Sequence, residues 1–330
     1  MLKTRTLGRS GLEVSELGLG CMGMSQWYGA TDDRESIATV HRALELGCTL
    51  FDSAEAYGPY DNEELLGRAL AGRRDQAVIA TKFGFPMKLK DGSTAEADSR
   101  PEHIRAVVEA ALGRLGTDHI DLLYQHRLDP RVPIEEVVGA MAELVGQGKV
   151  RHLGLCEVGE RTIRAAHAVH PLTAVQAEFS VWERNLEQDV LPVLRELGIG
   201  LVGFCPLGRG FLTGGVKRAE DYPEDDFRHH DPRLQGANYD QNMAIAASVA
   251  DLAAELELTP AQLAIAWVLH QGPDIVPIPG TKRRSYLEEN AHAAEVALDA
   301  ETLARIDRAV RAEQVAGPRY NERMMAYIDR

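Results

Sequence analysis

Short apolar runs recur along the chain, and between them lie stretches in which apolar residues return every three or four positions. The runs are nearly continuous in apolar character, which is typical of strands covered on both faces of a parallel sheet. The eight runs are LGLGC, TLFDS, AVIATKF, IDLLYQH, VRHLGLC, TAVQAEF, GLVGFCP and DIVPIPG.

The stretches between the runs have the periodicity of amphipathic helices. In the clearest, Ser99 and Glu102 have the spacing of a capping box, and Gly116 provides a stop. Another begins at Asp32 and ends at Gly47. Further helices are expected over residues 134–148, 160–170, 187–198 and 242–257.

Strand followed by helix, repeated eight times, requires parallel strands joined by helical crossovers. Eight such units in 330 residues match a (β/α)8 TIM barrel, predicted here as one domain over residues 1–330. An open, doubly wound sheet is the alternative. The segment KTRTLGRSGLEV predicts a β-hairpin ahead of the first barrel strand. Residues 206–240 predict a long loop on the C-terminal face, and residues 313–330 a tail over the barrel mouth.

Composition narrows the range of partners. A formal net charge of -14 argues against nucleic acid, whose phosphates favour a basic surface. No apolar run is long enough for a membrane span, and the N-terminus lacks the apolar block of a secretion signal, so a cytoplasmic protein is expected. The sequence is compatible with a homo-oligomer. The cysteines lack CxxC spacing and are expected to be reduced and mostly buried; they are Cys21, Cys48, Cys156 and Cys205.

Four polar residues fall at or just after the ends of three consecutive runs. Asp52 ends the second run and Tyr57 follows it, while Lys82 and His126 end the third and fourth. Each could have a structural role, as a cap, an ion pair or a packed side chain. Their shared position at strand ends, where barrel enzymes hold their chemistry, favours one site.

The four side chains together suit proton donation to an oxygen. A phenol has an ordinary pKa of about 10, and we expect the Lys82 ammonium to lower the pKa of Tyr57. Asp52 would hold Lys82 charged, and His126 would donate a second hydrogen bond to the same oxygen. The set could protonate an alkoxide that forms from a carbonyl, and it therefore implies a separate hydride donor.

A glycine- and base-rich turn follows the eighth run. Residues 280–284, GTKRR, lead into a helix whose N-terminal N–H groups suit a phosphate. The positive charges of Lys282, Arg283 and Arg284 favour a dinucleotide with a 2′-phosphate, hence NADP(H) rather than NAD(H). Taken alone, a solvated basic turn is equally compatible with this stretch. The loop CPLGRGFLTGG after the seventh run offers glycines for close approach to a pyrophosphate.

Two other patterns do not indicate sites. Gly18, Gly20 and Gly23 match GxGxxG, but the next helix begins only near Asp32, so we reject a Rossmann fingerprint. The pair His229 and His230 lies in the long polar loop without a spacing that would fix a metal, so no metal site is expected.

The motifs FDSAEAYG, ATKFG, LGTDHIDLLYQHR and IPGTKRRSYLEEN resemble signatures of the aldo-keto reductase family, in the right order. LGLGCMGMS resembles the first strand of its bacterial, plant and fungal oxidoreductase branch. The resemblance extends over nearly the whole chain. It implies a (β/α)8 barrel and NADPH-dependent reduction of aldehydes or ketones to alcohols.

The resemblance also assigns residues. Asp52, Tyr57, Lys82 and His126 match the family's catalytic tetrad, with Tyr57 as the acid. Gln176 matches a glutamine that holds the nicotinamide amide, and Phe204 falls where many members stack a tyrosine on the nicotinamide ring. Cys156 and Glu157 replace a common Ser-Asn pair, Gly280 replaces a Lys, and Tyr286 replaces an Arg. The residues expected to contact the cofactor are Gly20, Met22, Gly23, Asp52, Cys156, Gln176, Phe204, Cys205, Pro206, Leu207, Gly208, Arg209, Gly280, Thr281, Lys282, Arg283, Glu289 and Asn290.

Two alternatives to a carbonyl reductase are considered. The first is a nucleotide-binding regulatory subunit with little turnover. The second is a Schiff-base lyase that uses Lys82, which would need a desolvated lysine without a permanent acidic partner. The substrate itself is not readable from the sequence. Trp27, Tyr28, Phe85 and Trp182 could line an aromatic pocket or belong to ordinary packing.

Overall fold

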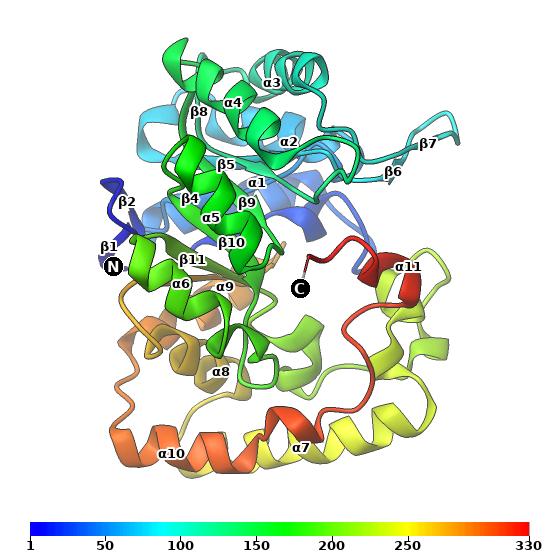
Figure 1. Ribbon diagram of the computed structural model, residues 1–330. Helices are drawn as coiled ribbons and strands as arrows, with labels where there is room; N and C mark the ends of the chain where they lie inside the picture. The colour runs from blue at the N-terminus through cyan, green and yellow to red at the C-terminus, as the bar shows by residue number, and fades with distance from the viewer. Residues whose placement is uncertain (330) are drawn as a thin grey trace.

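A ring of parallel strands surrounded by helices forms the body of the molecule in the computed structural model, which describes residues 1–329 (Figure 1). The apolar runs predicted as strands form β3, β4, β5, β8, β9, β10, β11 and β12. The strands are β1 (Thr4–Leu7), β2 (Leu12–Ser15), β3 (Leu19–Gly20), β4 (Leu50–Asp52), β5 (Val78–Phe83), β6 (Met87–Lys88), β7 (Thr94–Ala95), β8 (Ile120–Gln125), β9 (Val150–Cys156), β10 (Ala174–Glu178), β11 (Gly200–Phe204) and β12 (Ile275–Ile278).

The sheet closes on itself between its first and last strands. The order around the ring is β3, β4, β5, β8, β9, β10, β11 and β12, and every pair is parallel. The N–H groups of Gly18 and Gly20 then donate to the carbonyls of Pro277 (3.0 Å) and Pro279 (3.2 Å). Glycine at Gly20 suits this close approach, because a Cβ there would lie only 3.0 Å from the Ile278 carbonyl oxygen. The predicted (β/α)8 barrel is confirmed, and the open sheet is not formed.

Helices cover the outside of the ring and join consecutive strands (Figure 1). The helices are α1 (Asp33–Glu45), α2 (Asp61–Leu70), α3 (Pro101–Leu115), α4 (Ile134–Gly146), α5 (Glu160–Val169), α6 (Val190–Leu197), α7 (Gly236–Glu255), α8 (Pro260–Leu269), α9 (Arg284–His292), α10 (Ala300–Ala309) and α11 (Glu322–Met325).

The predicted helix ends are partly confirmed. Asp32 caps α1 by accepting the Arg34 N–H, and Gly116 ends α3 in a left-handed conformation with φ 63°. The capping box at Ser99 was wrong, because Arg100 is the N-cap of α3 and makes no side-chain cap bond. The Ser99 hydroxyl instead accepts a 2.8 Å hydrogen bond from Gln125 of β8. The hydrogen bond with Gln125 therefore takes the place of the predicted bond between Ser99 and the first turn of α3.

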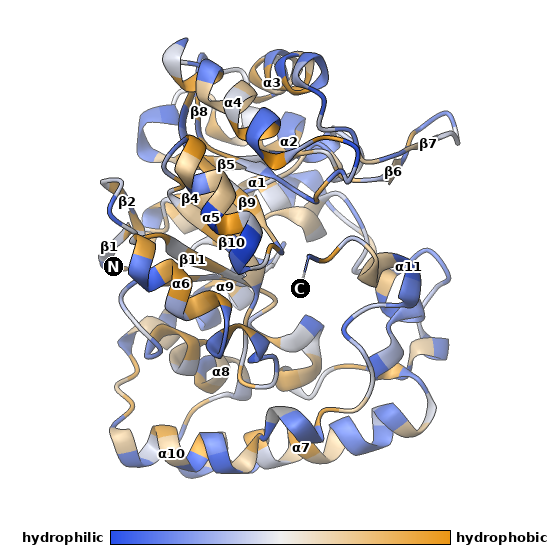
Figure 2. Ribbon diagram, viewed as in Figure 1, coloured by the Kyte–Doolittle hydropathy of each residue, from blue (hydrophilic) through white to orange (hydrophobic). Residues whose placement is uncertain are grey.

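Two apolar layers hold the barrel together. One lies between the strands and the amphipathic helices, which carry hydrophobic and hydrophilic positions along their length (Figure 2). The other fills the lumen and includes Leu50, Leu122, Val202 and Val276. Each such buried side chain contributes about 1.5–3 kcal/mol to folding. The predicted hairpin β1–β2 is confirmed, and its side chains Leu7, Leu12 and Val14 belong to the lumen cluster.

Long segments lie on the C-terminal face of the barrel, where β4, β5 and β8 end. Residues 206–240 contain short 3-10 helices, which the sequence pattern did not predict, and the start of α7 at Gly236. The 3-10 helices are Gly208–Thr213, Ala219–Asp221, Phe227–His230 and Pro232–Leu234. The hairpin β6–β7, also not predicted, projects from the body of the molecule (Figure 1). The tail runs past α11 and returns to the barrel, where the Asp329 N–H donates to the Glu157 carbonyl at 3.2 Å. The tail expected over the mouth is therefore present.

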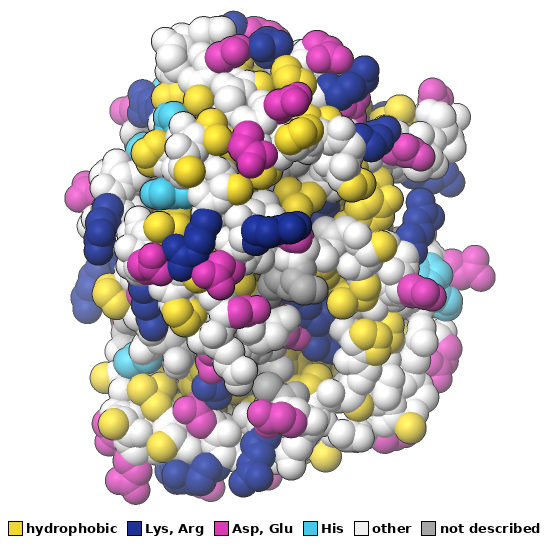
Figure 3. All heavy atoms as spheres, in the orientation of Figure 1, with side chains coloured by type: hydrophobic (Ala, Val, Ile, Leu, Met, Phe, Trp, Pro, Cys, Tyr) yellow, Lys and Arg dark blue, Asp and Glu magenta, His cyan; other side chains and the backbone are white. Residues whose placement is uncertain are grey.

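No single helix within residues 1–329 is long and apolar enough to cross a membrane. Helices α7 and α8 reach that length and composition only when taken together, and they are bent by 89° at the break between them. On the face shown in Figure 3, basic and acidic side chains are interspersed among small hydrophobic patches.

Candidate active site

The four predicted catalytic residues lie together at the C-terminal ends of neighbouring strands. Asp52 is the last residue of β4, Lys82 is the next-to-last residue of β5, and His126 directly follows β8. Tyr57 lies in the turn between β4 and α2. Because side chains alternate along a strand, Asp52 points into the lumen together with Leu50, and Lys82 together with Ala80.

Lys82 is the centre of this group. All three hydrogens of its ammonium group have an acceptor: Oδ1 of Asp52, the Ser53 carbonyl at 2.8 Å, and the Tyr57 hydroxyl at 3.1 Å. Its side chain is fully buried. Burial alone would lower the pKa of Lys82, but the charge of Asp52, the hydrogen bond to Asp52 and the nearby Tyr57 and Cys156 together outweigh burial, and the pKa is raised. Lys82 is therefore a fixed positive charge aimed at the Tyr57 oxygen.

The hydroxyl of Tyr57 is a neutral donor. Burial raises the pKa of Tyr57 to about 12, and the nearby Lys82 charge only partly offsets this effect. The expected net lowering of this pKa was wrong, because the desolvation of the phenolate is larger than the attraction of the ammonium. Tyr57 consequently keeps its proton at neutral pH, as a general acid must.

His126 faces Tyr57 edge to face, with ring centroids 5.9 Å apart and planes at 84°. Phe85 also packs against the imidazole, with ring centroids 4.5 Å apart. Burial, followed by the positive charges of Lys82 and Arg127, holds the pKa of His126 well below its usual value. The ring is therefore neutral at physiological pH and can donate a hydrogen bond from one nitrogen only. Its Nδ1 is buried, without a partner among residues 1–329.

Several residues expected at the cofactor lie around the same mouth. Gly20 and Gly280 pair where the ring closes, and Met22 and Gly23 form the 3-10 turn that follows. A Cβ at Gly23 would meet no atom within 4 Å, so its backbone faces open space. Phe204 is partly exposed at the end of β11 and packs on the lumen cluster.

Two of the residues expected to contact the cofactor, Cys156 and Gly208, are buried in the protein. Cys156 ends β9 inside the lumen, where burial raises the pKa of its thiol to about 12. Gly208 lies against Trp182, and a Cβ at Gly208 would be 2.7 Å from the indole ring. Cys205, with φ 52°, stands in the strained turn that begins the loop; Pro206 and Leu207 follow it.

The basic turn before α9 has three positively charged side chains, and among the described residues an ion pair with a carboxylate is formed by Arg284. Lys282 donates to the carbonyls of Tyr28 (3.0 Å) and Gly29 (2.9 Å), whereas Arg284 is paired with Glu35. Arg283 is exposed. Burial and the neighbouring charges of Arg283 and Arg228 lower the pKa of Lys282. An anion at this turn would relieve that repulsion, so the turn fits a phosphate. Thr281 precedes it, and Glu289 and Asn290 follow within α9.

A buried ion network joins the long loop and the tail to the barrel. The Arg209 guanidinium donates to Glu178 at the end of β10 and to Asp231, and also to the Arg319 carbonyl. Arg319 in turn forms two hydrogen bonds with the Glu157 carboxylate, at 3.1 and 2.7 Å. The Arg209 side chain is thus engaged within the protein. Glu157 and Arg319 were not predicted to pair, since no local pattern links positions so far apart.

The aromatic candidates separate into two groups. Phe85 lies at the imidazole of His126, and Trp27 packs on Phe227 (5.3 Å), which also contacts Tyr320 of the tail. Trp182 is a buried packing residue against Phe211.

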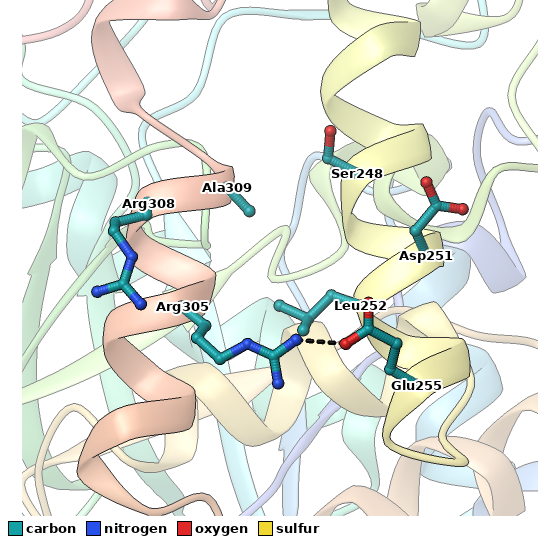
Figure 4. A pocket seen from close by; sticks show the side chains of 7 residues that line it. All are labelled: Ser248, Asp251, Leu252, Glu255, Arg305, Arg308 and Ala309. Atoms are coloured by element: carbon teal, nitrogen blue, oxygen red, sulfur yellow. Dashed lines mark hydrogen bonds and ion pairs between the residues drawn. The ribbon is translucent and has the colours of Figure 1, made fainter.

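Two further features of residues 1–329 lie away from the barrel mouth. His229 and His230 each bond a backbone carbonyl of their own loop, and in the described part of the chain no His, Cys, Asp and Glu side chains gather as a metal site. A shallow groove between α7 and α10 holds an Arg305–Glu255 ion pair (Figure 4). Its lining includes none of the four residues at the barrel mouth.

Comparison with known proteins agrees with this fold. Residues 16–311 match the model of the aldo/keto reductase family. The glycerol dehydrogenase AKR11B4 from Gluconobacter oxydans is 30% identical, with a TM-score of 0.85 and coverage of 96% of this chain and 97% of that one. The aldo-keto reductase AKR11C1 from Bacillus halodurans is 26% identical, with a TM-score of 0.78 and coverage of 98% and 99%. A thermostable aldo-keto reductase, Tm1743, is 27% identical, with a TM-score of 0.75 and coverage of 93% and 100%. The family match and these similar proteins support an oxidoreductase that acts on carbonyl compounds. The chain therefore belongs to the aldo/keto reductase family.

Proposed function

We propose that this protein reduces small aldehydes or ketones to alcohols with NADP(H). The observation that carries the proposal is the alignment of Lys82 between Asp52 and the protonated hydroxyl of Tyr57. A neutral His126 lies beside that hydroxyl and can donate a second hydrogen bond to the same oxygen.

In this mechanism, a bound nicotinamide cofactor supplies the hydride. Tyr57 donates its proton to the carbonyl oxygen as negative charge develops there, and His126 stabilises that charge by a hydrogen bond. Lys82 stabilises the phenolate left on Tyr57, and Asp52 keeps Lys82 in place. The residues that would hold the cofactor include Gln176 and Phe204 at the mouth, and Lys282 and Arg283 at the turn before α9.

The direct test is oxidation of NADPH by the purified protein with a panel of aldehydes and ketones. Glyceraldehyde belongs in the panel because one similar protein is named a glycerol dehydrogenase. Saturable turnover with at least one carbonyl supports the proposal. Tight nucleotide binding without turnover across the panel would instead favour the nucleotide-binding regulatory subunit.

The Schiff-base lyase is disfavoured by the surroundings of Lys82. A lysine nucleophile must lose its proton, which requires a lowered pKa. Here the pKa of Lys82 is raised and all three of its donors are engaged. Borohydride trapping of a carbonyl substrate on Lys82 would revive this alternative.

The reduction rate should stay constant between about pH 8 and about pH 10, a range in which an ordinary tyrosine begins to ionise. The acid form of Tyr57 is the active one, and its pKa of about 12 keeps it protonated throughout this range. The measurement is kcat against pH at saturating cofactor and substrate. A loss of half the activity near pH 9 would show instead that the lowering of this pKa by Lys82 outweighs the effect of burial.

Arg283→Ala should weaken NADPH binding by about 10-fold or more, since a charge-assisted hydrogen bond contributes about 1.5–3 kcal/mol. NADH binding should change little, because NADH lacks the 2′-phosphate. Arg284→Ala is the matched control, since that guanidinium is paired with Glu35. The measurement is quenching of tryptophan fluorescence by each nucleotide. Equal losses for NADPH and NADH would mean that Arg283 does not contact the 2′-phosphate.

A further inference from the structure

Asp52 and Gln176 meet across the barrel lumen, although their strands stand on opposite sides of the ring. Three strands separate β4 from β10 in either direction around the closed sheet. The Nε2 group of Gln176 nevertheless donates a 2.7 Å hydrogen bond to Oδ2 of Asp52, and both side chains are buried. This bond links two opposite walls of the barrel next to Lys82.

The Asp52 carboxylate has a separate partner on each oxygen. Oδ2 accepts from Gln176, while Oδ1 accepts from Lys82. Rotation of the carboxylate would therefore break both bonds at once. Lys82 then donates to the Tyr57 hydroxyl at 3.1 Å. The result is one connected series of three hydrogen bonds from Gln176 to the proton donor.

The surrounding lumen leaves this series little freedom. Tyr124 of β8 is fully buried and fills the space beside Gly154, where a Cβ would lie 2.4 Å from its ring. Burial, and then the nearby Asp52 charge, raise the pKa of Tyr124, so its phenol is neutral beside the carboxylate. Close-packed side chains of this kind hold neighbouring polar groups in one arrangement.

We propose that Gln176 is a positioning residue for proton donation, because its hydrogen bond across the lumen fixes the carboxylate that aligns Lys82 on Tyr57. This inference rests on the proposed reductase function. It adds to the contact with the nicotinamide amide that the family resemblance implies, since it assigns Gln176 an effect on the chemical step.

Loss of the Gln176 amide leaves Asp52 held from one side only. The Lys82 ammonium then loses its fixed direction toward the Tyr57 oxygen. Because Lys82 favours the phenolate, Tyr57 becomes a weaker acid when that alignment is lost. The effect falls on kcat through the acidity of Tyr57. A nicotinamide contact alone would affect cofactor binding and hydride orientation without moving the ionisation of Tyr57.

Gln176→Met is the main test, because methionine keeps the length of the side chain and removes the donor. At saturating NADPH, kcat for carbonyl reduction should fall by about 10- to 100-fold, the range typical of a misplaced reacting group. The pH midpoint of the reverse reaction, alcohol oxidation, should move upward. An unchanged kcat and pH profile, with only a higher KM for the cofactor, would overturn the proposal.

A double-mutant cycle with Asp52→Asn shows whether Gln176 acts through Asp52. If it does, Gln176→Met should have little further effect on kcat once Asp52 is replaced, because the link is already weakened. Independent, multiplicative losses would overturn the proposal. Leu122→Met is the matched control: it is a volume-conserving change of a buried lumen residue that leaves the hydrogen bonds in place.

A readout without turnover separates this proposal from the reductase function itself. In protein labelled with ¹³C-tyrosine, the Cζ resonance of Tyr57 is assigned by its loss in Tyr57→Phe. That resonance should shift in Gln176→Met and stay in place in Leu122→Met. An unchanged resonance in Gln176→Met overturns the positioning role. If the resonance shifts while the wild-type protein reduces no carbonyl, the positioning role stands and the proposed function fails.

Discussion

Tyr57→Phe is expected to lower kcat for carbonyl reduction by about 10²- to 10⁴-fold, the usual contribution of a general acid. Phenylalanine keeps the ring that meets His126 edge to face but removes the oxygen to which Lys82 donates at 3.1 Å. The proton then has no donor at that position. Steady-state kinetics at saturating NADPH measure the loss, and fluorescence titration should give a cofactor Kd close to that of the wild type.

Tyr60→Phe is the matched control for this variant. Tyr60 lies three residues along the same turn, is partly exposed, and stacks with the Arg114 guanidinium at 4.6 Å. The removal of its hydroxyl should leave kcat nearly unchanged. If Tyr57→Phe retained activity within about 10-fold of the wild type, the loss would be smaller than a general acid contributes, and Tyr57 could not be the proton donor.

Arg319→Met is expected to lower the free energy of unfolding by about 3–5 kcal/mol, as measured by urea denaturation. Arg319 binds both oxygens of Glu157 and lies 3.7 Å from Glu178. Both carboxylate side chains are fully buried. Without the guanidinium, two fully buried carboxylates, those of Glu157 and Glu178, each lose a nearby positive charge inside the protein. The tail should also become more sensitive to limited proteolysis, because Arg319 is one of its anchors on the barrel.

Arg164→Met serves as the control for the buried ion pair. Arg164 also binds both oxygens of a glutamate, Glu196, but this pair is exposed to solvent. Its loss should have a much smaller effect on stability, since water already screens exposed pairs. The double variant with Arg319→Met and Glu157→Gln should recover part of the lost stability, because it removes the charge of the buried carboxylate that Arg319 had bound. Equal effects of Arg319→Met and Arg164→Met would contradict a buried anchor.

The barrel and the positions of the reactive residues could be predicted because they depend on local patterns. Asp52, Lys82 and His126 follow from apolar runs that end in a polar residue, and parallel strands bring such ends to one face. Gly116 and Asp32 mark helix ends because glycine adopts the left-handed conformation and aspartate accepts backbone N–H groups.

Features that depend on burial or on distant partners could not be predicted. The direction of the Tyr57 pKa is set by desolvation, which appears only once the lumen is packed. Ser99 bonds Gln125 rather than its own helix, and Glu157 meets Arg319 across 162 positions of sequence. The hydrogen bond between Gln176 and Asp52 spans the lumen of the barrel. Each of these contacts exists only after the ring has closed.

The most direct test of the central claim follows the hydride and the proton donor together. The protein would be incubated with a carbonyl substrate from the panel and NADPH deuterated at C4 of the nicotinamide, with each of the two C4 positions labelled in turn. We predict that one labelled form transfers deuterium to the carbinol carbon of the alcohol, as detected by mass spectrometry, and that Tyr57→Phe greatly slows this transfer. The absence of deuterium from the product with both labelled forms would contradict the account.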